Sequence, residues 1–190
     1  MKYLVLVVMV ACSMAKVEID SSELLPYKES SQVTKLSQKL RPVRIDLVED
    51  KRENKSFGFA YTGVQYVKSP VEFGVPLDIL IRDLTTDAFE KRNLIIDNRP
   101  NSLGMEIQVN KFWVEEVIEE FQPEKARCKI DLSFHINAEK TKWSGQYWTE
   151  FTSGGDLSDG TTRLAPTLAS CFNELIEKLV NDQKFQEILK

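Results

Sequence analysis

The stretch CKIDLSFHIN, residues 128–137, alternates strictly between apolar and polar side chains. Successive side chains of a β-strand point to opposite faces, so this period of two predicts a strand with one buried and one solvated face. The solvated face would carry Lys129, Asp131 and His135. This strand sets the pattern for the sequence on either side of it.

Two neighbouring stretches repeat the alternation. Residues 105–110 place Met, Ile and Val on one face, and residues 143–151 do the same with Trp, Tyr, Thr and Phe, leaving Trp148 on the other face. The period slips at 112–114, which predicts a bulge or bend in the first of these strands. Together the three stretches predict a three-stranded antiparallel run.

Shorter strands are predicted nearer the N-terminus. Val43, Ile45 and Leu47 alternate with polar residues and predict a half-buried strand. Residues 57–73 are rich in aromatic side chains and predict either a hairpin or an irregular loop. Residues 94–96 predict a short strand, and 98–101 a turn.

Two apolar stripes at three- and four-residue spacing predict helices. The first begins at Pro76 and ends near Asn93, and the second runs from about Thr162 to Asp182, with a short turn at 185–189. Helices that are apolar on one side must bury that side against another layer. The expected fold is therefore α+β, a two-layer sandwich in which a mixed, mostly antiparallel sheet carries two amphipathic helices on one face.

The N-terminal segment MKYLVLVVMVACSMA, residues 1–15, has the order of an export signal: a positive charge, a short apolar run, then small residues. Its apolar run is about half the roughly 20 residues that span a bilayer. Cys12 follows Ala11 as in a bacterial lipobox, which predicts acylation of its thiol. Two alternatives remain: a cut after Ala15 that releases a soluble domain, and a buried N-terminal strand.

The expected organisation is a signal peptide at 1–11, a polar tether at 12–40 and one domain at 41–190; a loosely packed arm is the alternative to the tether. Covalent lipid on Cys12 would attach the protein to a membrane, and no other cofactor is expected. Ser13 favours the outer membrane, facing the periplasm, in a Gram-negative host. The oligomeric state stays open.

Composition excludes some partners and leaves the cysteines undecided. The formal charge is −4 and the pI is near 5.2, so the dense basic patch of a nucleic-acid surface is absent. Cys128 and Cys171 could pair as a disulfide in an oxidising compartment. Both lie on apolar faces, which instead favours two separate buried thiols.

The order of motifs resembles the YajG family of bacterial lipoproteins. After the lipobox come a V-x-I-x-L strand, a D-x-R motif at 50–52, the strand MEIQVNKFWVEEV at 105–117 and a D-x-x-F-x-x-x-L tail that begins at Asp182. The resemblance covers roughly residues 41–190. It implies a membrane-anchored periplasmic domain and supplies no catalytic residues, because the function of the family is undefined.

Catalytic and metal-binding patterns are weak throughout. A single histidine, His135, excludes a histidine-rich zinc site and is expected at the surface. Residues 156–160 have some oxygen ligands of a calcium loop but not its full set, and capping of the last helix explains them better. The glutamates at 115–120 are expected to form a solvated acidic edge. We therefore expect no enzyme activity and no metal site.

Aromatic residues offer the best candidates for a binding surface, because they bury a large area at a low entropy cost. We select Trp148, Tyr61, Tyr66 and His135, and expect other aromatic residues to pack under the helices. The leading hypothesis is a non-catalytic envelope lipoprotein that binds a protein partner. The alternatives are a carrier of small molecules or lipids and, with no motif behind it, a hydrolase.

Overall fold

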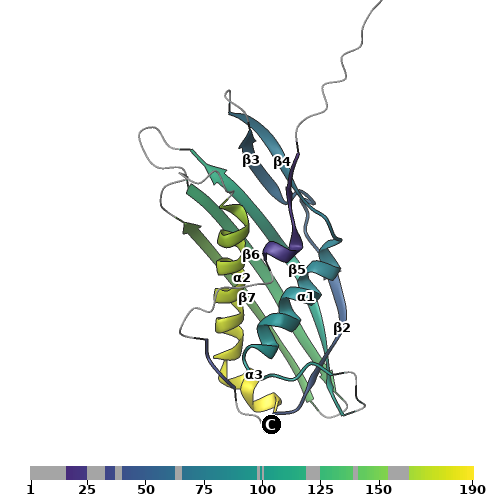
Figure 1. The fold of residues 1–190 in the computed structure, drawn as a ribbon. Helices are drawn as coiled ribbons and strands as arrows, with labels where there is room; N and C mark the ends of the chain where they lie inside the picture. The colour runs from purple at the N-terminus through teal and green to yellow at the C-terminus, as the bar shows by residue number, and fades with distance from the viewer. Residues whose placement is uncertain are drawn as a thin grey trace, which may run out of the picture.

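The computed structural model describes residues 16–24, 33–36, 40–62, 66–97, 99, 101–118, 125–138, 141–153 and 163–190. Three long strands form its centre: β5 (Leu103–Val117), β6 (Lys125–Ala138) and β7 (Thr141–Ser153). Each pairs antiparallel with the next, as the alternation predicts. These strands run the length of the molecule in Figure 1.

Four shorter strands complete a seven-stranded sheet in which β1, β4, β3, β5, β6 and β7 lie in that order. They are β1 (Val17–Ile19), β2 (Val43–Asp50), β3 (Gly58–Thr62) and β4 (Val67–Phe73). The aromatic stretch is thus a hairpin of β3 and β4. Both β2 and β3 pair parallel with β5, β2 along its first half and β3 near its end.

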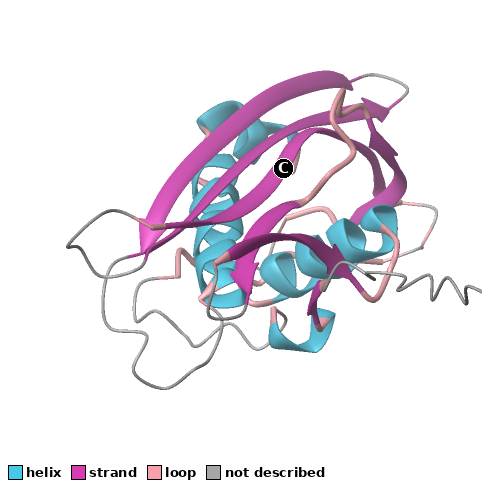
Figure 2. Ribbon diagram, turned by 90° about the horizontal axis from the view of Figure 1, so that it is seen from above, coloured by secondary structure: helices cyan, strands magenta, loops and turns pink. Residues whose placement is uncertain are grey.

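The helices cover one face of this sheet, which confirms the two-layer α+β fold (Figure 2). They are α1 (Leu77–Glu90), α2 (Leu164–Val180) and the short α3 (Gln183–Ile188), with a 3₁₀ turn at Ser21–Glu23. Pro76 caps α1 at its N-terminus, where no helical N–H is needed. The core lies between α1, α2 and the inward side chains of β5 and β6, and its residues are almost fully buried.

Two bulges change the simple alternation. In β2 the register shifts between Ile45 and Leu47, so Val48 is buried and Leu47 is exposed. The expectation that Leu47 shares a face with Val43 is wrong, because a bulge residue turns the rest of a strand over. In β5 the shift lies between Val109 and Lys111, close to the predicted slip.

Segments outside the main sheet differ from the sequence expectation. Of the predicted strand at 94–96, only a single bridge forms, between Val43 and Ile96. The expected tether at 12–40 is not a free linker in its described part: β1 pairs with β4, and Ile19, Leu24 and Leu36 are buried. These apolar side chains agree with the alternative of a packed arm, because burying them offsets the cost of ordering the chain.

A disulfide joins β6 to α2. The structure bonds Cys128 to Cys171, in place of two separate thiols. Both residues lie fully within the core. Cysteines at apolar positions are often separate buried thiols. The same positions also bring β6 and α2 into contact, so burial alone does not distinguish free thiols from a disulfide.

Candidate functional site

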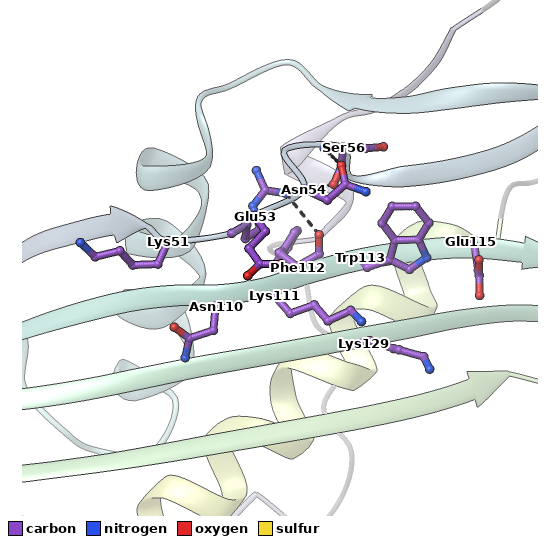
Figure 3. A pocket seen from close by; sticks show the side chains of 11 residues that line it. Lys51, Glu53, Asn54, Ser56, Asn110, Lys111, Phe112, Trp113, Glu115 and Lys129 are labelled. Carbon is purple, nitrogen blue, oxygen red and sulfur yellow. Dashed lines mark hydrogen bonds between the residues drawn. The ribbon is translucent and has the colours of Figure 1, made fainter.

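The face of the sheet opposite the helices carries the candidate site. Along β5, β6 and β7 the side chains of this face are polar, charged or aromatic, whereas the alternate residues are buried in the core. Figure 3 looks onto this face, with α2 behind the strands. Its most exposed large side chain is Trp148 on β7, at 65%.

The chain between β2 and β3 crosses over β5 and is held there by Arg52. Arg52 is only 5% exposed, and its guanidinium donates to the Asp50 carboxylate at 3.0 Å and to the carbonyls of Ser56 at 3.2 Å and Phe112 at 3.3 Å. It also lies 4.5 Å from the ring centroid of Phe57. The D-x-R motif of the sequence is therefore a buried ion pair that pins this crossing to β5.

Arg52 lowers the pKa of Asp50. The hydrogen bonds from Arg52 to Asp50, with the attraction between their charges, lower the pKa of the Asp50 carboxyl to about 2. The carboxylate thus stays ionised throughout the neutral and mildly acidic range, and the crossing stays fixed.

Beside this crossing lies a hollow of about 620 Å³. Its wall is formed by the crossing chain, and its floor by β5 and β6 at the β5 bulge (Figure 3). The lining residues are Lys51, Arg52, Glu53, Asn54, Ser56, Asn110, Lys111, Phe112, Trp113, Glu115 and Lys129. A volume of this size is within the range of small-ligand sites, roughly 300–1,000 Å³.

Trp113 joins the hollow to an aromatic row on the same face. Its ring meets that of Phe59 edge to face at 6.1 Å, and Phe59 meets Tyr61 in the same way at 5.7 Å. The ammonium of Lys68 lies 4.3 Å from the centroid of Phe59. Rings held at such angles give a rigid apolar surface with a cation above it.

Charges of both signs surround the hollow. Lys129 pairs with Glu150 at 3.0 Å, and Arg127 pairs with Glu115. Lys111, on the floor, forms no ion pair within the described part of the chain. Glu115 is 8% exposed, so the expectation of a fully solvated acidic edge is wrong at this residue, because Arg127 compensates its burial.

Hydrogen bonds tie the floor of the face together. The Asn110 side-chain amide donates to Asp131 at 3.1 Å and to Ser133 at 2.8 Å. The Gln146 amide donates to both oxygens of Asp131, at 2.9 and 3.0 Å. This cross-strand network spans β5, β6 and β7 and holds the face rigid beside the hollow.

The four selected residues do not form one cluster. Tyr61 lies in the aromatic row on β3, and Tyr66 is 57% exposed at the turn before β4. Trp148 lies opposite Asp131, near the sheet edge, and His135 lies opposite Glu106, toward the other end of β6. They share a sheet but occupy different parts of it.

The surroundings of His135 and of the acidic residues bear on the chemistry of this face. His135 is half-buried, and its Nε2 atom has no hydrogen-bond partner in the described residues. In the same part of the chain, no group of three or more His, Cys, Asp or Glu could hold a metal ion. Rings, ammonium groups and amides remain to recognise a partner.

None of the residues that line the hollow was selected from the sequence as a binding residue, and Arg52, Lys111 and Trp113 are the most important of them. The D-x-R motif was a signal for Arg52, but its role also depends on the Phe112 carbonyl, which is distant in the chain. Alternation could not assign Trp113 to a face, because the period slips between Val109 and Phe112. Lys111 gives no local signal.

Several predicted features lie outside the described residues. These are the lipidation site Cys12, the loop at 156–160 and the glutamates 119–120. Among the helices that are described, none has the length and apolar composition needed to cross a bilayer.

Comparison with known proteins gives a family and a fold. A family model described as "Uncharacterized lipoprotein" matches residues 32–190. A solved structure of an uncharacterized protein is similar with a TM-score of 0.50 at 14% identity, covering 82% of this chain and 99% of that one. At that identity the likeness concerns the fold alone.

Two further solved structures are similar to this chain. A protein from Xanthomonas campestris has a TM-score of 0.48 at 14% identity, covering 82% of this chain and 90% of that one. A minor lipoprotein from Acinetobacter baumannii has a TM-score of 0.35 at 10% identity, covering 78% and 92%. A search of the curated proteins finds no match.

Proposed function

This chain belongs to the YajG family of uncharacterized lipoproteins, and from that membership we propose that it is a lipid-anchored, non-catalytic binding module of the bacterial envelope. Acylated Cys12 attaches it to the outer membrane on the periplasmic side, and the open face of its sheet binds a protein partner. The observation that carries the binding role is the hollow on that face, with Trp113 and Lys111 on its floor.

Three features of the face support recognition of a protein. It offers rigid aromatic rings and charges of both signs, which is the composition of protein interfaces. Trp148 adds an exposed anchor of the residue type that most often dominates binding energy. The hollow is open to solvent and shaped by fixed strands, so little conformational entropy is lost when a partner binds.

The carrier alternative gains no support from the core. A lipid would need a cavity between helices and sheet, but the opening between α1 and α2 has about 20 Å³. Side chains of the core fill the region around it. The larger hollow is on the opposite face and is lined by polar and charged groups.

Site-specific photo-crosslinking in intact cells tests the binding role. A benzophenone amino acid is placed at Trp113 or Trp148, and as a control at Ile79, which is 45% exposed on α1. We expect one discrete adduct from positions 113 and 148, reduced by Lys111→Glu, and none from 79. Equal labelling at all three positions, or none at any, would contradict the proposal.

Mass spectrometry of the mature chain tests the anchor. Acylation predicts a chain that starts at Cys12 with the added mass of lipid, recovered from membranes. In the Cys12→Ser variant the lipid mass should be missing. A mature wild-type chain that starts at Lys16 would instead establish soluble export.

A further inference from the structure

The distance between the anchor and the folded domain is set by β1. Four residues, 13–16, separate Cys12 from Val17, the first residue of β1. β1 pairs parallel with β4, with Val17 level with Val71. Ile19 is buried, and Lys16 pairs with Glu72 at 2.7 Å, so residues 16–19 are held to the sheet.

Covalent geometry then limits how far Cys12 can lie from the domain. Five residue steps of extended chain span at most roughly 17 Å. In the parallel register with β4, five residues before Val71 is Tyr66. Even a fully extended leader therefore brings Cys12 no farther out than the level of Tyr66, the residue directly before β4.

The side chains at this turn have the chemistry of a membrane interface. Tyr66 is 57% exposed and Val67 is 56% exposed, and Lys68 follows them. Lys68 is the only charged residue in the stretch 56–71. Tyrosine concentrates at the headgroup level of bilayers, and a lysine beside it suits anionic headgroups.

The backbone holds these side chains in place. Tyr66 has a φ of 51°, a left-handed conformation that a bulky residue rarely adopts. Thr62 and Ser69 are hydrogen-bonded hydroxyl to hydroxyl at 2.6 Å across the hairpin, and Ser69 is buried. A strained, bulky and exposed residue directly before a paired strand is the kind of feature that marks a functional contact.

We propose that Tyr66, Val67 and Lys68, here called the turn patch, rest on the phospholipid surface and orient the anchored domain. This inference depends on the proposed acylation of Cys12. The lipid holds the chain at the headgroup level, and the short leader brings the turn patch to the same level. The opposite end of the sheet, near Ile95, then projects roughly 45 Å away, since about fourteen residues of β5 at about 3.3 Å each separate the level of Lys68 from Leu103.

The test uses the full lipidated chain, purified from membranes and reconstituted in vesicles of phosphatidylethanolamine and phosphatidylglycerol. An environment-sensitive fluorophore is attached at Val67→Cys, or at Ile95→Cys, which is similarly exposed at 49%. Spin-labelled lipids serve as quenchers. We expect the emission at position 67 to fall at least about twofold and that at position 95 to stay unchanged.

A second variant tests the role of the patch itself. Tyr66→Asp introduces a residue type that tolerates a positive φ. It also adds a negative charge, which the lipid surface repels, so the variant should restore the emission at position 67. Ile79→Asp, on an exposed helix position, should leave the quenching unchanged. Circular dichroism and thermal unfolding confirm that each variant is folded.

The remaining outcomes separate the two proposals. Emission at position 67 that the lipid quenchers leave unchanged, in chains that float with the vesicles, would overturn the orientation and leave the anchor intact. A blue shift of the emission at position 67 without quenching by spin-labelled lipids would overturn the proposed orientation, because it would show that a second copy of the chain covers the patch. Chains that do not float with the vesicles would overturn the anchor and with it this inference.

Discussion

At the scale of single residues, the buried pair of Arg52 and Asp50 fixes the shape of the hollow. The guanidinium bridges Asp50, Ser56 and Phe112, which belong to three separate parts of the chain. A buried charge without its partner is costly, about 3–5 kcal/mol in proteins generally. The D-x-R motif therefore has a structural role, and Arg52 is part of the wall of the hollow.

Asp50 should make stability depend on acidity. In the folded protein the pKa of Asp50 is about 2, below the value of 3.8 in the unfolded chain. The ion pair therefore stabilises the fold fully well above pH 4, and this stabilisation is lost as the pH falls toward 2. Between pH 5 and pH 2 we expect the wild type to lose about 1–2 kcal/mol more unfolding free energy than Asp50→Asn, measured by urea denaturation.

Asp46→Asn is the matched control, because it removes an exposed ion pair with Arg44. Its pH profile should follow that of the wild type. If Asp50→Asn and wild type also showed the same profile, the strong pairing of Asp50 with Arg52 would be contradicted.

The hydroxyl of Tyr147 links β7 to the C-terminal helix. It donates to Asp182 at 2.6 Å, and Asp182 also accepts from the backbone N–H groups of Lys184 and Phe185 at the start of α3. Burial, and the hydrogen bond to Asp182, raise the pKa of Tyr147, and that same bond lowers the pKa of Asp182.

Tyr147→Phe should lower the unfolding free energy by about 1–2 kcal/mol, because it removes a hydrogen bond to a charged group. Tyr66→Phe, at an exposed turn, should have almost no effect. The two variants are compared by chemical denaturation at pH 7. Equal effects would show that the bond to Asp182 contributes nothing to stability.

At the scale of elements, the bulge in β2 decides which side chains reach the core. The extra residue lies between Ile45 and Leu47, where the register with β5 shifts. After it, Val48 is 7% exposed and Leu47 is 48% exposed. An uninterrupted alternation would have reversed these two positions.

Alanine substitutions at Val48 and Leu47 test whether β2 contains the bulge or follows a regular alternation. Val48→Ala should cost about 1.5–2.5 kcal/mol of unfolding free energy, since it removes buried apolar atoms. Leu47→Ala removes a larger side chain but should cost less than about 1 kcal/mol. Thermal unfolding of both variants measures the difference, and a larger loss from Leu47→Ala would restore the regular register.

At the scale of the whole molecule, the disulfide ties the sheet to its helical layer. Cys128 and Cys171 lie 43 residues apart in the chain, so the bond closes a long loop in the unfolded state. Chain-entropy estimates give about 4 kcal/mol for such a loop, and measured values are often lower.

We expect the Cys128→Ala, Cys171→Ala double variant to be less stable by about 2–4 kcal/mol, while retaining the fold. Reducing agent should lower the melting temperature of the wild type toward that of the variant and leave the variant unchanged. A wild type that melts identically with and without reductant would show that the bond does not form.

The structure of the N-terminal segment also depends on contacts with distant parts of the chain. Its sparse apolar residues gave no periodic signal, so a polar tether was the natural expectation for 12–40. In the fold, β1 adds to the edge strand β4, and Leu24 and Leu36 pack against the core. The ordered sheet therefore already includes Val17, the first residue of β1, well before the domain start expected at residue 41.

The sequence by itself determined the layers of this protein. Strict alternation at 128–137 and helical spacing after Pro76 and in the C-terminal helix depend on side chains within a few residues of each other, so local pattern predicts them. The resemblance to the lipoprotein family rested on the same order of elements, and the match over 32–190 confirms it.

Only the tertiary structure decided the hollow, the exposure of Leu47 and the position of β1. Each depends on groups far apart in sequence: Arg52 reaches the Phe112 carbonyl, a bulge in β2 is set against β5, and β1 needs the edge of β4. Burial and hydrogen bonding act between neighbours in space. A local sequence pattern therefore does not predict which residues that are far apart in the chain will come into contact.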